Sequence, residues 1–202
     1  MALQIIGSPR SRTMRTLWAA AELQLEYEHL PWSWDDPRLK DPEFLDMNPA
    51  GAIPTIIDDG FALSESLSIN LYLAKKYGHG DPLRLYPTSL EGEARVWRWS
   101  LWAQSHLEPW VQRDADLLLI REAAAESSFN VLQKSLRILD MAISKSGWLV
   151  NGSFTIADLN VAGVLSPSRA ATAGVHDHRH VSDWLDRCYQ RPAALAVRER
   201  FG

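Results

Sequence analysis

The pattern of apolar and polar residues divides the chain into a first part with strand and helix patterns and a longer part with helix patterns alone. Leu3 to Ile6 is a short apolar run typical of a strand. The next segment predicts one face of an amphipathic helix, because apolar residues recur at spacings of three and four: Met14, Leu17, Trp18 and Ala21. Leu25 to Leu30 predicts a second strand, which Pro31 ends.

Residues 32–78 complete this first part. Residues 32–48 are rich in breakers and predict a loop with at most a short helix. Two short apolar runs, Thr55 to Ile57 and Phe61 to Leu63, flank Asp58-Asp59-Gly60, a combination typical of a β-hairpin. A second helix should follow and end at Gly78; its predicted face is Ser66, Ile69, Asn70, Leu73 and Tyr77. We therefore expect βαβ and ββα units, with the first two strands parallel and the last two antiparallel.

The rest of the chain predicts helices only. Residues 79–88 have the Gly and Pro content of a linker. We expect an α/β domain at 1–78 and an all-helical domain at 89–202. Two apolar stripes mark helices in the second domain: Leu132, Leu136, Leu139 and Ile143, and then Val181, Trp184, Leu185 and Cys188.

Composition narrows the function classes. The chain has 202 residues, of which 46% are hydrophobic and 23% charged, and a formal net charge of −4. It carries no long basic stripe, so nucleic acid is not an expected partner. No apolar run approaches the ~18 residues of a membrane helix, and no signal-peptide pattern is visible. A single cysteine excludes an intrachain disulfide and a multi-cysteine metal site, which fits a cytoplasmic protein.

The first candidate for chemistry is "GSPRSRTMR", residues 7–15, where a strand gives way to a helix. A helix N-terminus carries unpaired N–H groups and partial positive charge, so it attracts anions. Ser8 is placed to donate a hydrogen bond to such an anion, and Ser11 to cap the helix. The alternative is that both serines are only turn and cap residues.

Two further stretches are candidates. In "NPAGAIPTI", Pro54 directly precedes a strand and forces Ile53 to be extended, which leaves the Ile53 main chain able to pair with an extended ligand. In "LSES", Glu65 can hold a ligand ammonium group and Ser66 a carboxylate. The alternatives are a plain edge proline and ordinary helix capping, with Ser64 as the N-cap.

Together these stretches resemble the glutathione S-transferase family, in particular the bacterial serine-type enzymes of the theta, zeta and tau classes. "SPRSRTMR" is similar to the active-site loop, and "NPAGAIPTI" with "ALSESLSINLYLAKKYG" to the glutathione-binding core. "NGSFTIADLNVAG" resembles the family's buried helix with a capping box formed by Thr155 and Asp158. "WLDRCYQRPAALAV" resembles its last helices. The resemblance covers essentially the whole chain and implies a thioredoxin-like domain followed by a helical bundle.

The resemblance also implies roles for individual residues. It implies that Ser8, or alternatively Ser11, activates the glutathione sulfur, and that the Ile53 main chain binds the cysteinyl part beside a cis Pro54. It implies that Glu65 and Ser66 hold the γ-glutamyl end, and that Lys40 meets the glycine carboxylate. Arg10, with Arg12 and Arg15, would suit an anionic ligand. A homodimer, a role in detoxification and no metal are implied as well.

A mechanism follows from these roles. A thiol of pKa about 8.5 is mostly protonated at neutral pH, and the thiolate is the nucleophile. Ser8 and the helix start would form an anion hole that stabilises the thiolate; Ser8 itself would not attack, because no neighbouring base is present. A serine at position 8 excludes the mixed disulfide that cysteine-type relatives form. Conjugation, peroxide reduction and isomerisation remain open.

The electrophile pocket is expected between the domains. Its candidate lining residues come from "RVWRWSLWAQSHLEPW": Trp99, Trp102, His106 and Trp110. A pocket lined by these aromatic side chains favours a flat hydrophobic electrophile. The alternative is that they pack in the hydrophobic core, as aromatic stripes on helices more often do. For "HDHRH", residues 176–180, we expect a solvated loop rather than a metal site, and for Cys188 a place in the core.

Two rival functions remain. One is a non-catalytic binding or scaffold module, which would not need to keep intact glutathione-site residues. The other is a zeta-like glutathione-dependent isomerase, which the arginines would suit. The loop Ser8-Pro9-Arg10, however, lacks the zeta-type Ser-Ser-Cys.

Overall fold

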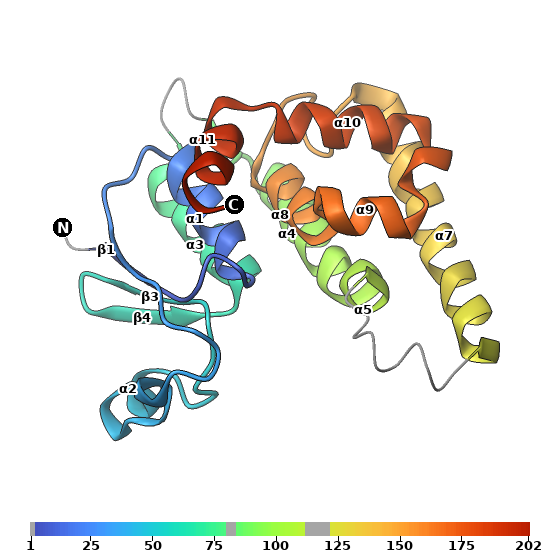
Figure 1. Ribbon diagram of the computed structural model, residues 1–202. Helices are drawn as coiled ribbons and strands as arrows, with labels where there is room; N and C mark the ends of the chain where they lie inside the picture. Colours follow the sequence, from blue (N-terminus) through green and yellow to red (C-terminus); the bar gives the residue numbers. More distant parts are fainter. Residues whose placement is uncertain (1–2, 80–83, 112–121) are drawn as a thin grey trace. The chain divides into compact units, whose positions relative to one another are not determined.

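The computed structural model describes residues 3–79, 84–111 and 122–202, and it separates into two compact units (Figure 1). The first unit comprises Met1–Tyr86 together with Arg191–Gly202, and the second comprises Pro87–Gln190. Of the predicted linker, residues 80–83 lie outside the described residues.

The first unit contains a mixed four-stranded sheet with the order β2-β1-β3-β4. β1 (Leu3–Ile6) pairs in parallel with β2 (Glu28–Leu30) and antiparallel with β3 (Thr55–Asp58). β3 pairs antiparallel with β4 (Phe61–Ser64) across the Asp59-Gly60 turn. The predicted parallel pair and the predicted hairpin are both confirmed, although β2 begins three residues later than expected.

Helices cover both faces of this sheet. α1 (Thr13–Glu22) and α3 (Ser66–Tyr77) lie on one face, and η1 (Pro37–Lys40) with α2 (Pro42–Met47) lies on the other (Figure 1). Side chains alternate between the faces along each strand. Ile6 therefore packs with Leu39 and Phe44 of the η1–α2 layer, and the arrangement is the thioredoxin-like fold that the sequence predicted.

α1 is more deeply buried than an amphipathic surface helix. Thr13, Arg15 and Thr16 are buried, while two members of the predicted apolar face, Met14 and Ala21, are only half-buried. The reason is that α1 packs against α3 and also against α11 (Pro192–Phe201), the last helix of the chain.

The return of α11 differs from the predicted domain boundary. Sequence patterns placed residues 89–202 in one helical domain, whereas Arg191–Gly202 belongs to the first unit. The helical pattern of α11 is local, but it packs against α1, which begins 179 residues earlier in the chain (Pro192 against Thr13).

The second unit is helical over its described residues. Its N-terminal part consists of α4 (Leu90–Trp102), the π-helix η2 (Ala103–Leu107) and α5 (Glu108–Val111). The remaining helices are α7 (Glu122–Ser146), α8 (Ile156–Leu165), α9 (Pro167–Ala173), η3 (Val175–Asp177) and α10 (Arg179–Tyr189). All residues of α8 are buried, and both predicted apolar stripes, on α7 and α10, are buried as well, Cys188 included.

The predicted capping box at the start of α8 is confirmed. The carboxylate of Asp158 accepts hydrogen bonds from the main-chain N–H and the hydroxyl of Thr155, at 2.9 and 3.1 Å. It also accepts from the Leu149 N–H at 3.0 Å and from Trp184 Nε1 at 2.9 Å. Burial raises the pKa of Asp158 above its ordinary value, although these donors oppose the shift. One carboxylate thus holds the start of α8, the preceding loop and α10 together.

The histidine-rich stretch is solvated at His176 and His180, as we expected, but it forms η3 and the start of α10 rather than a loop, and His178 is buried. His178 is 8% exposed, and its Nε2 lies 2.8 Å from Oε1 of Gln133 on α7. His180 lies at the start of α10 and contacts Asp140 of α7 at 2.9 Å. Tertiary contacts with α7 order this segment. Within the described ranges, no three His, Cys, Asp or Glu side chains gather as metal ligands, and no helix is long and apolar enough to cross a bilayer.

Candidate functional site

The register of the sheet brings the three candidate stretches together at one end of its strands. Ile6 lies opposite Thr55 in the β1–β3 pair, and Thr55 lies opposite Ser64 in the β3–β4 pair. Ser8 follows Ile6 by two residues, Ile53 precedes Thr55 by two, and Ser66 follows Ser64 by two. Ile6, Thr55 and Ser64 lie side by side at one end of their strands, so the residues that follow or precede them by two lie at that same end of the sheet.

The two serines form different hydrogen bonds at the start of α1. Ser11 Oγ donates to the Ser8 carbonyl at 2.7 Å and accepts from the Thr13 N–H at 3.1 Å. Its Oγ also lies 2.8 Å from Thr13 Oγ1. Ser8 Oγ accepts from the Arg10 N–H at 3.3 Å. The N-cap of α1 is Arg12, without a side-chain capping bond, so the prediction of Ser11 as the N-cap is wrong. Ser11 lies one residue earlier; its Oγ accepts from the N–H of the first helical residue, and its proton is directed at the Ser8 carbonyl.

Gly7 allows this loop to pack closely. Its φ is +140°, and a Cβ added there would overlap Thr13 Oγ1 and lie 3.0 Å from the Cβ of Ile53. Only glycine fits such a position. The absence of a side chain at position 7 is what brings the start of α1 against the segment that precedes Pro54.

Asn48 organises the loop that carries Ile53 and Pro54. The Ile53–Pro54 peptide bond is cis, as the resemblance implied. The buried Asn48 side chain donates to the Ala52 carbonyl and to Thr55 Oγ1, both at 2.9 Å. Sequence reasoning assigned Asn48 no role. Its position before a proline, in a loop whose main chain an amide can bond, was the available signal.

Lys40 lies beside this loop. A Cβ at Gly51 would lie 3.1 Å from Lys40 Nζ, and the Lys40 side chain is exposed. Its neighbour Arg38 is engaged elsewhere: the guanidinium pairs with Asp36 at 2.6 Å and lies 4.4 Å from the centroid of the Trp32 ring. Lys40 is thus an exposed cation beside this loop, whereas Arg38 is paired with Asp36.

Glu65 has a backbone conformation that non-glycine residues rarely adopt. Its φ is +71° and its ψ 108°, and its side chain is exposed. α3 begins at the next residue, Ser66, and its N-cap is Glu65 without a side-chain capping bond, so the alternative of Ser64 as the N-cap is wrong. Such a conformation costs about 1–3 kcal/mol and is typical of functional sites.

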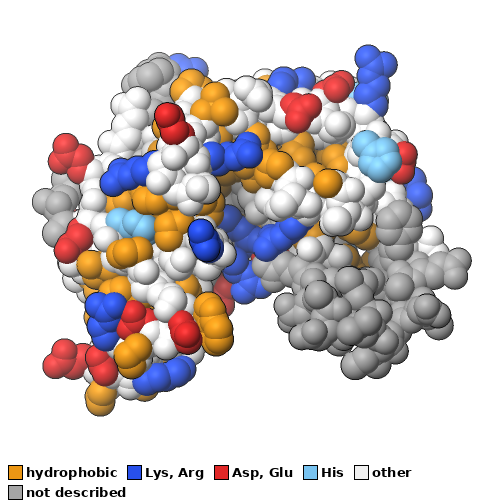
Figure 2. All heavy atoms as spheres, in the orientation of Figure 1, with side chains coloured by type: hydrophobic (Ala, Val, Ile, Leu, Met, Phe, Trp, Pro, Cys, Tyr) orange, Lys and Arg blue, Asp and Glu red, His pale blue; other side chains and the backbone are white. Residues whose placement is uncertain are grey.

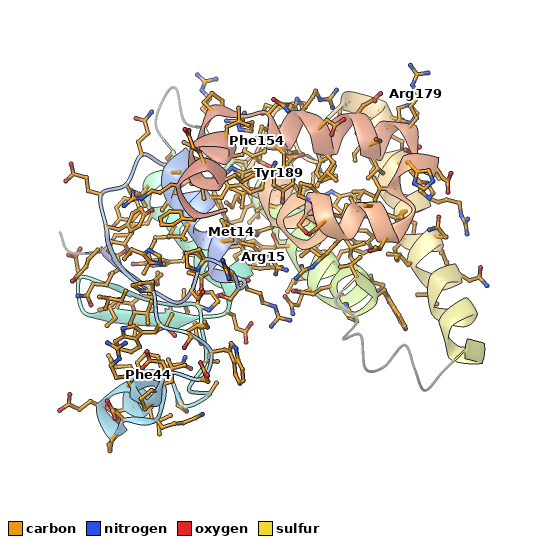
Figure 3. The ribbon with its side chains drawn as sticks, in the orientation of Figure 1. Met14, Arg15, Phe44, Phe154, Arg179 and Tyr189 are labelled. Atoms are coloured by element: carbon orange, nitrogen blue, oxygen red, sulfur yellow. The ribbon has the colours of Figure 1, made fainter. Side chains whose placement is uncertain are left out.

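The three arginines at the start of α1 do not form one exposed cluster. Arg10 and Arg12 are exposed, whereas Arg15 is 4% exposed on α1 (Figure 3). Arg15 Nη1 donates to Ser66 Oγ at 3.4 Å, and the Arg15 carbonyl accepts from Asn70 Nδ2 at 3.4 Å. The sequence placed Arg15 near an anionic ligand but did not reveal its contact with α3. On the face of the first unit seen in Figure 2, basic and acidic side chains are interspersed.

The predicted pocket residues lie on α4, η2 and α5 of the second unit. Trp99 is 2% exposed and packs edge-to-face on Trp102, with ring centroids 5.2 Å apart. Trp102 and His106 are stacked at 7° and 6.4 Å, and His106 Nδ1 lies 2.7 Å from Ser105 Oγ. Trp110 is half-buried on α5.

The π-helix changes which of these residues share a face. A regular helix would place Ala103, His106 and Trp110 on one stripe with Trp99, but η2 adds a wider turn at Ala103–Leu107. The residues with stacked rings that reach the surface are Trp102 and His106. Trp99 packs edge-to-face on Trp102 and is itself buried.

Comparison with known proteins identifies both halves of the chain. Residues 9–76 match the glutathione S-transferase N-terminal domain, and residues 101–192 match the glutathione S-transferase C-terminal domain. Glutathione S-transferase 3 of Zea mays is 30% identical over 95% of this chain and 90% of its own length. Glutathione S-transferase F13 of Arabidopsis thaliana is 29% identical over 98% of this chain and 95% of its own.

The solved structures agree with the sequence relatives. Glutathione transferase F7 from Populus trichocarpa superimposes with a TM-score of 0.82 at 27% identity, over 99% of each chain. These relatives are plant proteins of the F series, the phi class. The narrower resemblance to bacterial theta, zeta and tau enzymes is therefore not supported.

Proposed function

The chain belongs to the glutathione S-transferase family and is a glutathione transferase, and we propose that it activates the glutathione thiol at the start of α1 for attack on a hydrophobic electrophile. The observation that supports this most strongly is the meeting of three segments at one end of the sheet. Ser8 and Ser11, the Ile53 main chain, and Glu65 with Ser66 come from β1–α1, the loop before β3, and β4–α3. An extended tripeptide needs such separate contacts along its length.

Each part of glutathione has a partner of matching chemistry. Ile53 precedes Thr55, the first residue of β3, and therefore lies outside the strand ladder. We assign its main chain to pair with the cysteinyl unit. Ser66 and the first N–H groups of α3 suit the γ-glutamyl carboxylate, and the exposed Glu65 carboxylate suits its ammonium group. Lys40 suits the glycine carboxylate, and the exposed Arg10 adds positive charge.

The thiolate requires a hydrogen-bond donor at the start of α1. Lowering a thiol pKa by about two units takes roughly 2.7 kcal/mol of preferential stabilisation of the thiolate. One charge-assisted hydrogen bond of about 1.5–3 kcal/mol and a helix N-terminus together supply this. We assign the donor to Ser8, because its Oγ accepts from Arg10 while the Ser11 proton is directed at a carbonyl.

Ser11 is the second candidate for the same role. Its Oγ accepts the Thr13 N–H and therefore lies at the positive end of α1, where a thiolate is best stabilised. If its proton turned from the Ser8 carbonyl to the sulfur, Ser11 would be the donor.

Glutathione titrations of the wild type and of the Ser8→Ala and Ser11→Ala variants test this assignment, with thiolate absorbance followed by difference spectroscopy at neutral pH. We expect the thiolate signal to disappear in Ser8→Ala and to persist in Ser144→Ala, a matched change at an exposed serine of α7. Loss in Ser11→Ala alone would transfer the role to Ser11. No binding by the wild type at millimolar glutathione would favour the scaffold function instead.

We propose that Trp102 and His106 form part of the electrophile site. Two parallel rings bind flat aromatic groups well. Cysteine is absent from Ser8-Pro9-Arg10-Ser11, so the proposed reactions are conjugation, peroxide reduction or isomerisation and not disulfide exchange through an enzyme cysteine.

We also propose that the protein is a homodimer, as the family resemblance implied. In support, α4 carries a stripe of exposed apolar side chains, Leu90, Trp97 and Leu101, and α7 carries exposed Ile138 and Met141. Sedimentation of the wild type and of Leu101→Glu is the test: a dimer that the variant converts to a monomer supports the proposal, and a monomeric wild type contradicts it.

A further inference from the structure

Arg15 connects the starts of two helices within the first unit. It lies in the first turn of α1, it is 4% exposed, and its guanidinium donates to the hydroxyl of Ser66, the first residue of α3. Asn70, one turn further along α3, donates in return to the Arg15 carbonyl. The two bonds connect α1 to the first and second turns of α3.

The hydrogen bond determines how Ser66 can act. A serine hydroxyl has one proton and two lone pairs. Because Arg15 Nη1 donates to Ser66 Oγ, one lone pair is occupied and the Ser66 proton is directed elsewhere. A hydroxyl that accepts from a cation is polarised and is a stronger donor in turn. Ser66 is therefore prepared to donate to an anion at the start of α3.

We propose that Arg15 is a positioning residue that makes Ser66 a hydrogen-bond donor for the α-carboxylate of the γ-glutamyl group. This inference rests on the proposed function, because it assigns the γ-glutamyl end to Ser66. Arg15 acts through Ser66, so it strengthens binding of thiols that carry this carboxylate and not of thiols that lack it. It therefore sets the selectivity for glutathione.

The chemistry of the side chain supports this role. A planar guanidinium holds several N–H groups in fixed directions, so it can bond to one hydroxyl while its other donors serve the surroundings. A lysine ammonium keeps the charge but loses that fixed geometry. The Arg15→Lys variant therefore separates the effect of charge from the effect of orientation.

A double-mutant cycle tests the proposal, with glutathione affinity measured by calorimetry for the wild type, Arg15→Gln, Ser66→Ala and the double variant. We expect each single variant to bind glutathione about tenfold more weakly, and the double variant no more weakly than Ser66→Ala, because coupled residues are not additive. Losses that add up would show that Arg15 acts independently of Ser66 and would overturn the inference.

The selectivity between glutathione and an analogue without the α-carboxylate is a second test of the proposal. A glutathione analogue in which the γ-glutamyl α-carboxylate is an amide should bind the wild type and Arg15→Gln equally well. An equal loss of affinity for glutathione and analogue would indicate a merely structural role for Arg15. Arg15→Lys, which is the variant to use if Arg15→Gln does not fold, should show the same loss for glutathione, since orientation and not charge is at issue.

Two matched variants control for general effects. Ser68→Ala removes an exposed serine two residues after Ser66, and Arg137→Gln removes an exposed arginine of the second unit; both should bind glutathione as the wild type does. Absence of glutathione binding by the wild type would overturn the proposed function together with the inference. Binding with additive losses would overturn the inference alone.

Discussion

Glu22 and Arg191 form a bidentate ion pair although they are 169 positions apart in the sequence. Arg191 Nε donates to Glu22 Oε1 at 2.7 Å, and Nη2 donates to Oε2 at 2.8 Å. Trp18 Nε1 donates to the same carboxylate at 3.0 Å. The Glu22 side chain is 5% exposed, so these hydrogen bonds offset the cost of burying its carboxylate. This pair holds the end of α1 to the residue that precedes α11.

Removing the arginine of this pair should destabilise the protein. Arg191→Ala leaves a buried carboxylate without its cation, and we expect a loss of about 2–4 kcal/mol in the free energy of unfolding. Glu22→Gln should cost less, because a neutral amide still accepts from Trp18. Urea denaturation measures both. Arg200→Ala, an exposed change on α11, is the control, and an equal loss in that variant would contradict the argument.

Asp58 should make stability depend on pH at both ends of the range. Burial would raise its pKa, but hydrogen bonds from Lys76, Tyr72 and Tyr77 hold the pKa of Asp58 below its ordinary value. The same contacts, first of all the bond to Asp58, raise the pKa of Lys76.

The signs follow from linkage. A lowered carboxyl pKa stabilises the fold above the unfolded value near 4 and loses that contribution as pH falls through the folded pKa. The raised pKa of Lys76 stabilises the fold below about pH 10.4 and is lost only as pH rises through the folded value. Urea denaturation of Asp58→Asn should therefore show lower stability at neutral pH and a flatter acid limb. Asp59→Asn, at the exposed neighbour, should keep the wild-type profile.

Gly7→Ala should weaken glutathione binding as well as stability. The added Cβ meets Thr13 Oγ1 and Ile53, so the start of α1 must move away from the loop before Pro54. We expect a loss of about 2–4 kcal/mol in the free energy of unfolding, measured by thermal denaturation, with weaker binding measured by calorimetry. Gly60→Ala also has a positive φ but meets nothing within 4 Å, so it should destabilise less and bind normally. Equal effects in the two variants would contradict the close-packing argument.

Trp102→Ala should affect the electrophile and not glutathione. Removing the ring that stacks on His106 should raise the KM for an aromatic electrophile about five- to tenfold, the effect of losing one aromatic contact. The glutathione Kd should be unchanged, because all residues of the proposed glutathione site lie in the first unit. Trp34→Ala, at a ring that is 81% exposed, controls for the loss of a tryptophan. A rise in the glutathione Kd would show that Trp102 acts on the fold instead.

Features that depend on neighbouring residues could be predicted from the sequence. The Asp59-Gly60 turn and its flanking strands, the capping box of Thr155 and Asp158, and the stripes of α7 and α10 follow from spacing and turn chemistry within a few residues. The sequence by itself therefore determined the fold class, the element order over residues 3–78 and the three segments that the proposed site uses.

What the tertiary structure decided involves residues that are distant in the chain. Arg15 bonds to Ser66 across 51 positions and His178 to Gln133 across 45. Arg191, directly before α11, bonds to Glu22 of α1. A local pattern reports that a side chain is charged or apolar, but not which distant group will bury it. The π-turn of η2 likewise redirected the aromatic stripe, because a helical period read from sequence assumes regular hydrogen bonding. Packing between separate segments settles these partners, since the free energy of burial depends on contacts that only the folded chain brings together.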